Sequence, residues 1–106
     1  MTSNKAKELF NSRGEHIAFV LHDELHRLTG ENCGHYVPDK AVFIDMKGKY
    51  QGEIFKEKYL LRNNVSPFAK AAGMGKPGYA GNIGKPGKFS DIAPIALPDG
   101  WTDVSL

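Results

Sequence analysis

Cys33 and His35 are the residues whose types and spacing come closest to nucleophilic catalysis. They lie two positions apart, so an extended strand would place both side chains on one face. A thiol beside an imidazole could ionise to a thiolate nucleophile. However, a two-residue offset leaves the side chains parallel, and no Asn or Asp is placed to orient the imidazole. We therefore expect a small buried thiol beside an edge histidine, with a small Cys/His-dependent enzyme as the alternative.

The histidine and acidic residues form no recognisable metal or acid–base pattern. The four histidines crowd into the first third of the chain: His16, His22, His26 and His35. Neither an HExxH spacing nor paired cysteines accompany them, so we expect turn and surface histidines and no metal or cofactor. Three acids each follow a glycine by nine positions: Asp23, Asp39 and Glu57. We expect these carboxylates to be turn residues rather than a catalytic pair.

A basic, glycine-rich segment is the main candidate for ligand binding. From Arg62 to Phe89 the chain carries five basic residues and neither Asp nor Glu. Lysines that contact phosphates and aromatic rings that stack on bases are typical of nucleic-acid binding. The predicted binding residues are Lys70, Lys76, Tyr79, Lys85, Lys88 and Trp101. The alternatives are a solvated loop whose lysines keep it soluble, and a tryptophan that packs on the domain.

The same segment has glycine at every third position from 75 to 87. This is the period of collagen and of an extended polyproline-II helix. A collagen-like triple helix would assemble a homo-oligomer, but five triplets are few, and Tyr79, Ile83 and Phe89 are unusual in one. We expect instead a flexible loop or an extended segment laid on the rest of the domain.

A pattern of glycine, a small residue four positions later and an apolar residue two further on recurs along the first half. The three copies are Gly14…Ala18…Val20, Gly30…Gly34…Tyr36 and Gly48…Gly52…Ile54. β-Branched and aromatic runs between breaks of Asp, Lys, Gly and Asn predict hairpins. The expected strands cover residues 9–11, 16–21, 25–28, 33–37, 41–45, 50–55 and 59–62. The recurrent small residue predicts strands that cross close to a common axis, where no bulk fits.

Turns with glycine, or asparagine in its place, separate these strands. They lie at 11–14, 29–30, 45–48 and 62–64, and both residue types tolerate positive φ. The fourth outgoing strand would begin near Val65 and be interrupted by Pro67. Residues 3–10 could alternatively begin a helix. We therefore predict an all-β fold, with four short hairpin repeats in pseudo-four-fold symmetry over residues 8–70. A glycine-rich extended segment and tail, residues 71–106, would pack on the same domain.

Bulk properties exclude several classes of protein. The chain has 106 residues, which is typical of one domain, and its net charge is only +2. A single cysteine cannot form an internal disulfide. The N-terminus lacks the apolar core of a signal peptide, and the apolar run 17–21 is too short to cross a bilayer. We expect a cytoplasmic protein without membrane contact.

The repeat resembles that of the four-fold β-flower proteins, a small bacterial family of four-hairpin domains. The residues that carry the likeness are Leu9-Phe10-Asn11…Gly14…Ala18, Gly30…Gly34, and Phe43-Ile44-Asp45…Gly48…Gly52. The resemblance covers residues 8 to about 70. It implies four hairpins around a pseudo-four-fold axis and brings no catalytic residues.

Pseudo-symmetry without a convergent set of polar residues favours a non-enzymatic binding or interaction module. Its partner would be another protein or a second copy of the chain. The first alternative is binding of nucleic acid or another polyanion through residues 62–89, and the second is the Cys/His enzyme.

Overall fold

The computed structural model describes residues 6–71, 73–84 and 87–106, which form an all-β fold. The strands are β1 (Lys7–Phe10), β2 (His16–Leu21), β3 (Glu24–Arg27), β4 (Asn32–Val37), β5 (Val42–Asp45), β6 (Tyr50–Phe55), β7 (Tyr59–Asn63) and β8 (Trp101–Asp103). One short 3₁₀ helix, η1 (Pro67–Lys70), follows β7. Within the described ranges, no helix has the length and hydropathy needed to cross a membrane.

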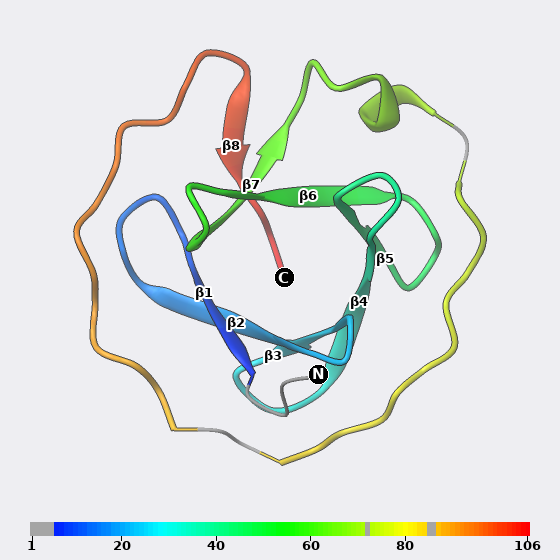
Figure 1. The fold of residues 1–106 in the computed structure, drawn as a ribbon, viewed down its shortest axis with the longest axis horizontal. Coiled ribbons are helices and arrows are strands. Elements are labelled where there is room, and N and C mark those ends of the chain that lie inside the picture. Colours follow the sequence, from blue (N-terminus) through cyan, green and yellow to red (C-terminus); the bar gives the residue numbers. More distant parts are fainter. Residues whose placement is uncertain (1–5, 72, 85–86) are drawn as a thin grey trace.

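The first seven strands close into a barrel. Consecutive strands pair antiparallel in the order β1 to β8, and β1 also pairs parallel with β7 through Phe10 and Tyr59. The N–H of Phe10 donates to the carbonyl oxygen of Lys58 (2.9 Å) at this junction. Closure pairs the two edges that an open sheet would expose. β8 then adds beside β7, and the chain ends at the centre of the ring (Figure 1).

Glycine turns join the strands of three hairpins, β1–β2, β3–β4 and β5–β6. In each turn the glycine N–H donates to the carbonyl three residues earlier, at 2.9, 2.8 and 2.9 Å for Gly14, Gly30 and Gly48. These glycines have φ of +84°, +94° and +85°, a conformation that side chains with a Cβ rarely adopt. The predicted turns at 11–14 and 45–48 are therefore confirmed, and the second turn spans 27–30.

Tighter turns connect β2 to β3 and β6 to β7. Both central residues have positive φ: His22 and Asp23 at 51° and 63°, and Lys56 and Glu57 at 51° and 67°. Two central residues with positive φ suit the twist of a hairpin, although non-glycine residues adopt this conformation at a cost. Asp23 and Glu57 are turn residues, as predicted.

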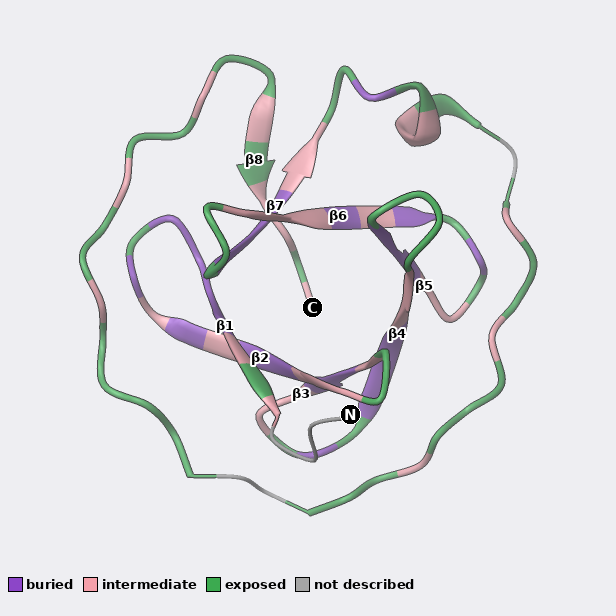
Figure 2. Ribbon diagram, viewed as in Figure 1, coloured by how far each residue is buried: buried purple, intermediate pink, exposed green. Residues whose placement is uncertain are grey.

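Apolar side chains from several strands form the core of the barrel. Leu9, Ala18, Leu25, Phe43 and Leu60 have no exposed surface and form one core cluster. Figure 2 shows that the buried residues lie along the strands of the ring, whereas the segment outside it is mostly exposed. Complete burial of a Leu or Phe side chain contributes about 1.5–3 kcal/mol.

Neighbouring strands leave no space for a side chain at Gly34 and Gly52, two of the small residues of the sequence repeat. A Cβ on Gly34 would lie 2.6 Å from the side-chain oxygen of Gln51, and one on Gly52 would lie 2.7 Å from the carbonyl oxygen of Leu61. Both distances are far below van der Waals contact. The expectation that no bulk fits at these positions is therefore confirmed.

Residues 7–10 form a strand, in line with the strand predicted for residues 9–11 and not with the alternative helix, because Leu9 and Phe10 are buried in the cores. One local expectation was wrong. No strand begins at Val65, which is 73% exposed. The side-chain oxygen of Asn63 accepts the N–H of Val65 (3.1 Å) and turns the chain away, and Pro67 starts η1. The antiparallel partner of β7 is β8 instead, with Asn63 opposite Trp101.

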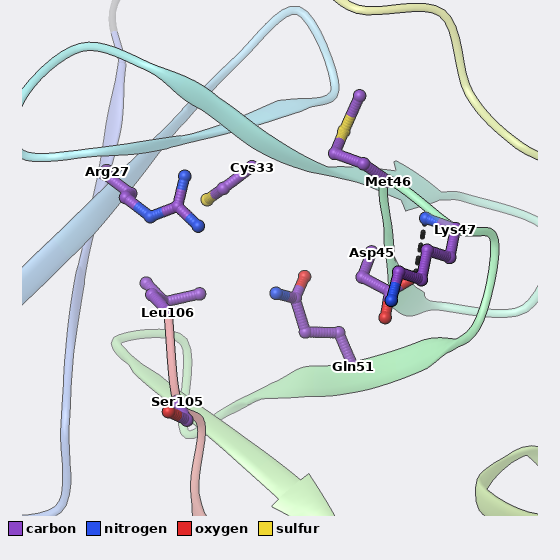
Figure 3. Close-up of a pocket in the computed structure, with 8 residues that line it drawn as sticks. All are labelled: Arg27, Cys33, Asp45, Met46, Lys47, Gln51, Ser105 and Leu106. Atoms are coloured by element: carbon purple, nitrogen blue, oxygen red, sulfur yellow. Dashed lines mark hydrogen bonds between the residues drawn. The ribbon is translucent and has the colours of Figure 1, made fainter.

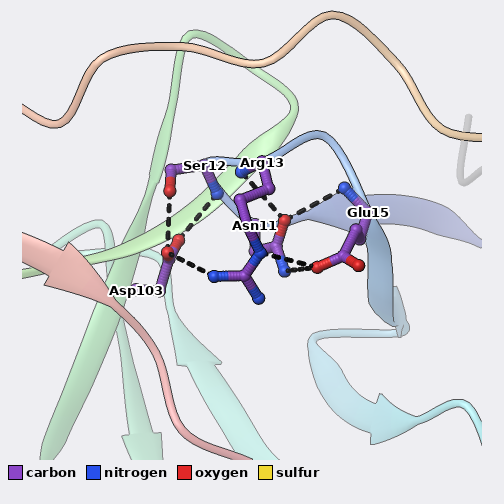
Figure 4. Close-up of polar contacts among 5 residues, drawn as sticks. All are labelled: Asn11, Ser12, Arg13, Glu15 and Asp103. Atoms are coloured by element: carbon purple, nitrogen blue, oxygen red, sulfur yellow. Dashed lines mark hydrogen bonds and ion pairs between the residues drawn. The ribbon is translucent and has the colours of Figure 1, made fainter.

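Asp103 fastens β8 to the turn between β1 and β2. Its carboxylate accepts the N–H and the hydroxyl of Ser12, both at 2.7 Å (Figure 4). Beside this contact, hydrogen bonds from Asn11 and Arg13 lower the pKa of Glu15. The contact between Asp103 and Ser12 therefore connects β8 to a turn 91 positions earlier in the chain.

Candidate interaction surface

The segment between β7 and β8 encircles the barrel, and we call residues 73–97 of it the belt. Figure 1 shows the belt as an extended chain outside the strands, running past the three glycine turns before it returns to β8. It contains no strand among its described residues, apart from one isolated bridge between Asn82 and Glu31. The belt therefore follows the outside of the barrel as an extended segment.

Backbone bonds attach the belt to all three glycine turns, and the first turn receives an additional one, from the N–H of Ile95 to the carbonyl oxygen of Ser12 (2.8 Å). The N–H groups of Met74, Ile83 and Ile92 donate to the carbonyl oxygens of Gly48, Gly30 and Gly14, at 2.6, 3.1 and 2.9 Å respectively. The donors are nine residues apart (74, 83 and 92). The belt thus advances nine residues for each hairpin that it passes.

A second pair of contacts has the same spacing. The N–H of Ala80 donates to Oδ1 of Asn32 (2.8 Å), and that of Phe89 donates to Nδ1 of His16 (3.0 Å). Asn32 and His16 each lie two residues after their turn glycine, Gly30 and Gly14. In each of these two hairpins, the belt therefore donates to the same two acceptors: the carbonyl oxygen of the turn glycine and the side chain two residues after it.

The turn glycines also make room for the belt. A Cβ on Gly14 would lie 2.0 Å from the carbonyl oxygen of Ile92, and one on Gly30 would lie 2.1 Å from that of Gly84. Any side chain here would displace the belt. The glycines that mark the repeat therefore have a second role, close approach of another backbone, which the sequence pattern did not reveal.

The belt and the chain just before it expose several large apolar side chains. All large apolar side chains that are strongly exposed in the described part of the chain lie between residues 65 and 97: Val65, Tyr79, Ile83, Phe89 and Leu97. Tyr79 is 62% exposed and Phe89 52%. Aromatic residues such as these are enriched at interaction surfaces.

The predicted binding residues fall into three groups. Lys70, Lys76, Tyr79 and Lys88 are exposed, and they are distributed from residue 70 to residue 88, on the belt and on the chain just before it. Lys85 lies outside the described residues. Trp101 is half-buried and packs against Phe55, with ring centroids 5.3 Å apart.

The structure does not bring Cys33 and His35 together. Cys33 lines a cavity of about 290 Å³ with Arg27, Gln51 and the C-terminal Leu106 (Figure 3), and His35 is not part of that wall. Burial raises the pKa of the Cys33 thiol to about 11, so the thiol is protonated at neutral pH. His35 instead contacts Oε2 of Glu24 through Nδ1 (3.2 Å).

The other histidines occupy structural positions. His16 contacts Oε1 of Glu8 through Nε2 (2.7 Å). His26 contacts the carbonyl oxygen of Gly30 through Nδ1 (2.9 Å) and stacks on Phe19. In the ranges that the structure describes, no three His, Cys, Asp or Glu side chains converge to hold a metal ion.

Comparisons with known proteins add no family to this geometry. No protein-family model, curated protein or solved structure matches the chain.

Proposed function

We propose that this protein is a non-enzymatic interaction module in which the barrel is the scaffold and the belt contacts the partner. One observation carries the proposal. Asn63 and Trp101 are paired across β7 and β8, yet the segment that joins them holds all the strongly exposed large apolar side chains of the described residues. Long segments without secondary structure that stay ordered on a rigid scaffold are commonly functional.

We also propose that the barrel is a four-hairpin, β-flower-like repeat in which β7 and β8 are the fourth hairpin. Gly100 supports this, because its φ is +83° and its carbonyl oxygen accepts the N–H of Asn64 (2.8 Å). Val104 follows Gly100 by four positions, as Ala18 follows Gly14. On this proposal the belt is an insertion at the tip of the fourth hairpin. The free, buried thiol of Cys33 suits a reducing compartment such as the cytoplasm.

A photo-crosslinking experiment tests the interaction role. Benzoylphenylalanine replaces Tyr79 or Phe89 on the belt, and His22 on an exposed barrel turn serves as the matched control. In the cells that produce the protein, both belt positions should crosslink to the same discrete partner, and the His22 position should not. Equal crosslinking from all three positions, or none from the belt, would contradict the proposal.

Polyanion binding is the second candidate, favoured by exposed Lys70, Lys76 and Lys88 beside exposed Tyr79 and Phe89. Fluorescence anisotropy with a labelled single-stranded oligonucleotide and with heparin tests it. Binding should weaken steeply with salt. Replacing both Lys76 and Lys88 with Ala should weaken it further, whereas Lys40→Ala on the barrel should have little effect. Absence of binding at low salt would eliminate this candidate.

A further inference from the structure

The barrel closes without the C-terminal arm, which we define as residues 64–106. β1 and β7 already meet through Phe10 and Tyr59. The arm adds to this ring through β8 and the belt, and its last residues, Val104 and Leu106, lie against the core. It contacts the barrel by pairing along β7, by the belt bonds and by packing of Val104 and Leu106 on the core. The arm is therefore a separable element with a continuous docking path.

The sequence of the belt and of the two residues before it repeats every nine residues, in step with the hairpins. The three units are residues 71–79 (AAGMGKPGY), 80–88 (AGNIGKPGK) and 89–97 (FSDIAPIAL). The fourth residue of each unit donates its N–H to a turn glycine, and the first residue of the second and third units donates to Asn32 or His16. Each hairpin turn is thus a binding site for one nine-residue unit.

Recognition at these sites combines backbone bonds with packing of the third unit, in which Ile92 and Ile95 contact the cluster of Phe10, Tyr59 and Leu61. In the second unit the side chain of Ile83 is 49% exposed although its N–H is bonded to Gly30. A chain of the same sequence can therefore make the same contacts whether or not it belongs to the same molecule. Proline in the belt limits the conformations of the free segment and lowers the entropy cost of docking.

We propose that the turns form a peptide-binding rim that accepts the arm of a second copy of this chain, so that two chains exchange arms. Every contact that the arm loses on its own barrel is regained on the partner's barrel, which is the condition for segment exchange. The rim is the surface of the barrel on which the belt lies, whereas the partner under Proposed function contacts the exposed side of the belt. The two proposals therefore concern different surfaces. Local concentration favours the molecule's own arm at low protein concentration.

A chain with a weakened belt and an intact rim tests the proposal. Ile83→Pro and Ile92→Pro together remove two belt donors, because proline has no N–H, and leave all turn residues unchanged. The probe is a fluorescent peptide of residues 71–97. The matched control is Tyr79→Pro, at a position whose N–H makes no backbone bond within the described part of the belt. Trp101 fluorescence and circular dichroism report whether each variant is folded.

The folded double variant should bind the peptide at least roughly ten-fold more tightly than wild type or Tyr79→Pro does, because its own belt competes for the rim with two bonds fewer. A peptide with the same two prolines should bind at least roughly ten-fold more weakly. No binding to the folded variant, or equal binding of both peptides, would overturn the proposal.

If the double variant does not fold, the proposal is tested instead by arm exchange between wild-type chains. Chains with two different tags are mixed at high concentration and incubated. A mixed dimer in light scattering and tag capture supports the proposal, and monomers alone overturn it. Either failure leaves the crosslinking result at Tyr79 unaffected, so the two proposals fail separately.

Discussion

The imidazole of His16 accepts the backbone N–H of Phe89 at 3.0 Å, although 73 residues separate the two along the chain. Nδ1 is the acceptor, so the ring hydrogen lies on Nε2, where it donates to Glu8 (2.7 Å). At the equivalent position of the next hairpin, Asn32 accepts the N–H of Ala80. The same bond is thus made by a titratable group in one hairpin and by an amide in the other.

This equivalence predicts which side chains can hold the belt at Phe89. His16→Asn should keep the bond, since an amide oxygen accepts as that of Asn32 does, whereas His16→Leu removes the acceptor. The exchange protection factor of the Phe89 amide should fall roughly ten-fold in His16→Leu and stay close to the wild-type value in His16→Asn, while that of Ala80 stays constant in both. An equal fall in the two variants would contradict this prediction.

Gly30→Ala should release part of the belt and destabilise the fold. The residue has φ of +94°, and its Cβ would lie 2.1 Å from the carbonyl oxygen of Gly84. A left-handed alanine costs roughly 1–2 kcal/mol and a lost buried bond about 1 kcal/mol, so urea denaturation should show a loss of at least about 2 kcal/mol. Gly78→Ala is the control, because its Cβ meets nothing within 4 Å. An equal loss from both variants would argue against the close approach.

Cys33 should be unreactive while the protein is folded. Burial raises its pKa to about 11 from the ordinary 9.0, so iodoacetamide should label it slowly at pH 8 and rapidly in urea. Fast labelling of the folded protein at pH 8 would refute this.

The same pKa shift predicts a dependence of stability on alkaline pH. Between pH 9 and pH 11 the unfolded chain has lost the Cys33 proton while the folded chain retains it, so the free energy of unfolding falls as pH rises. Burial raises the pKa of Tyr50 as well, and that group adds to the fall above pH 10. Cys33→Ala should make the fall shallower than in wild type. Identical slopes in both proteins would show that Cys33 does not contribute.

Glu57→Gly should stabilise the barrel. Glu57 is an exposed turn residue with φ of +67°, a conformation that glycine adopts without strain. Thermal denaturation should show a gain of about 1 kcal/mol. Lys58→Gly, one position further on and without positive φ, should instead lose about 0.5–1 kcal/mol. A loss from Glu57→Gly would mean that its side chain makes a contact worth more than the relief of strain.

The strands and turns could be predicted from sequence because their signals are local. Alternating apolar residues mark the strands, and Gly14, Gly30 and Gly48 mark turns that need positive φ. The partner of β7 could not be located in this way, because Asn63 and Trp101 pair across a long insertion. A signal was present, since Gly100 and Leu106 keep the glycine and apolar spacing of the earlier units, but Val104 replaces the small residue.

The belt contacts were missed for a different physical reason. Met74, Ile83 and Ile92 dock through their N–H groups, which every residue except proline possesses, so no residue type identifies the sites. Only their spacing of nine does, and the more obvious glycine period of three obscured it. Of the candidate pair, Cys33 is buried and His35 contacts Glu24.

Residue-resolved amide exchange of the belt in the wild-type protein tests the central claim most directly. If the belt is docked as described, protection should peak at Met74, Ile83 and Ile92, nine residues apart, with further peaks at Ala80, Phe89 and Ile95. Belt amides that donate no hydrogen bond within the described residues, such as that of Tyr79, should exchange at rates close to those of a free peptide. Uniformly fast exchange from residue 73 to residue 97 would show that the belt is not held on the barrel and would contradict the account.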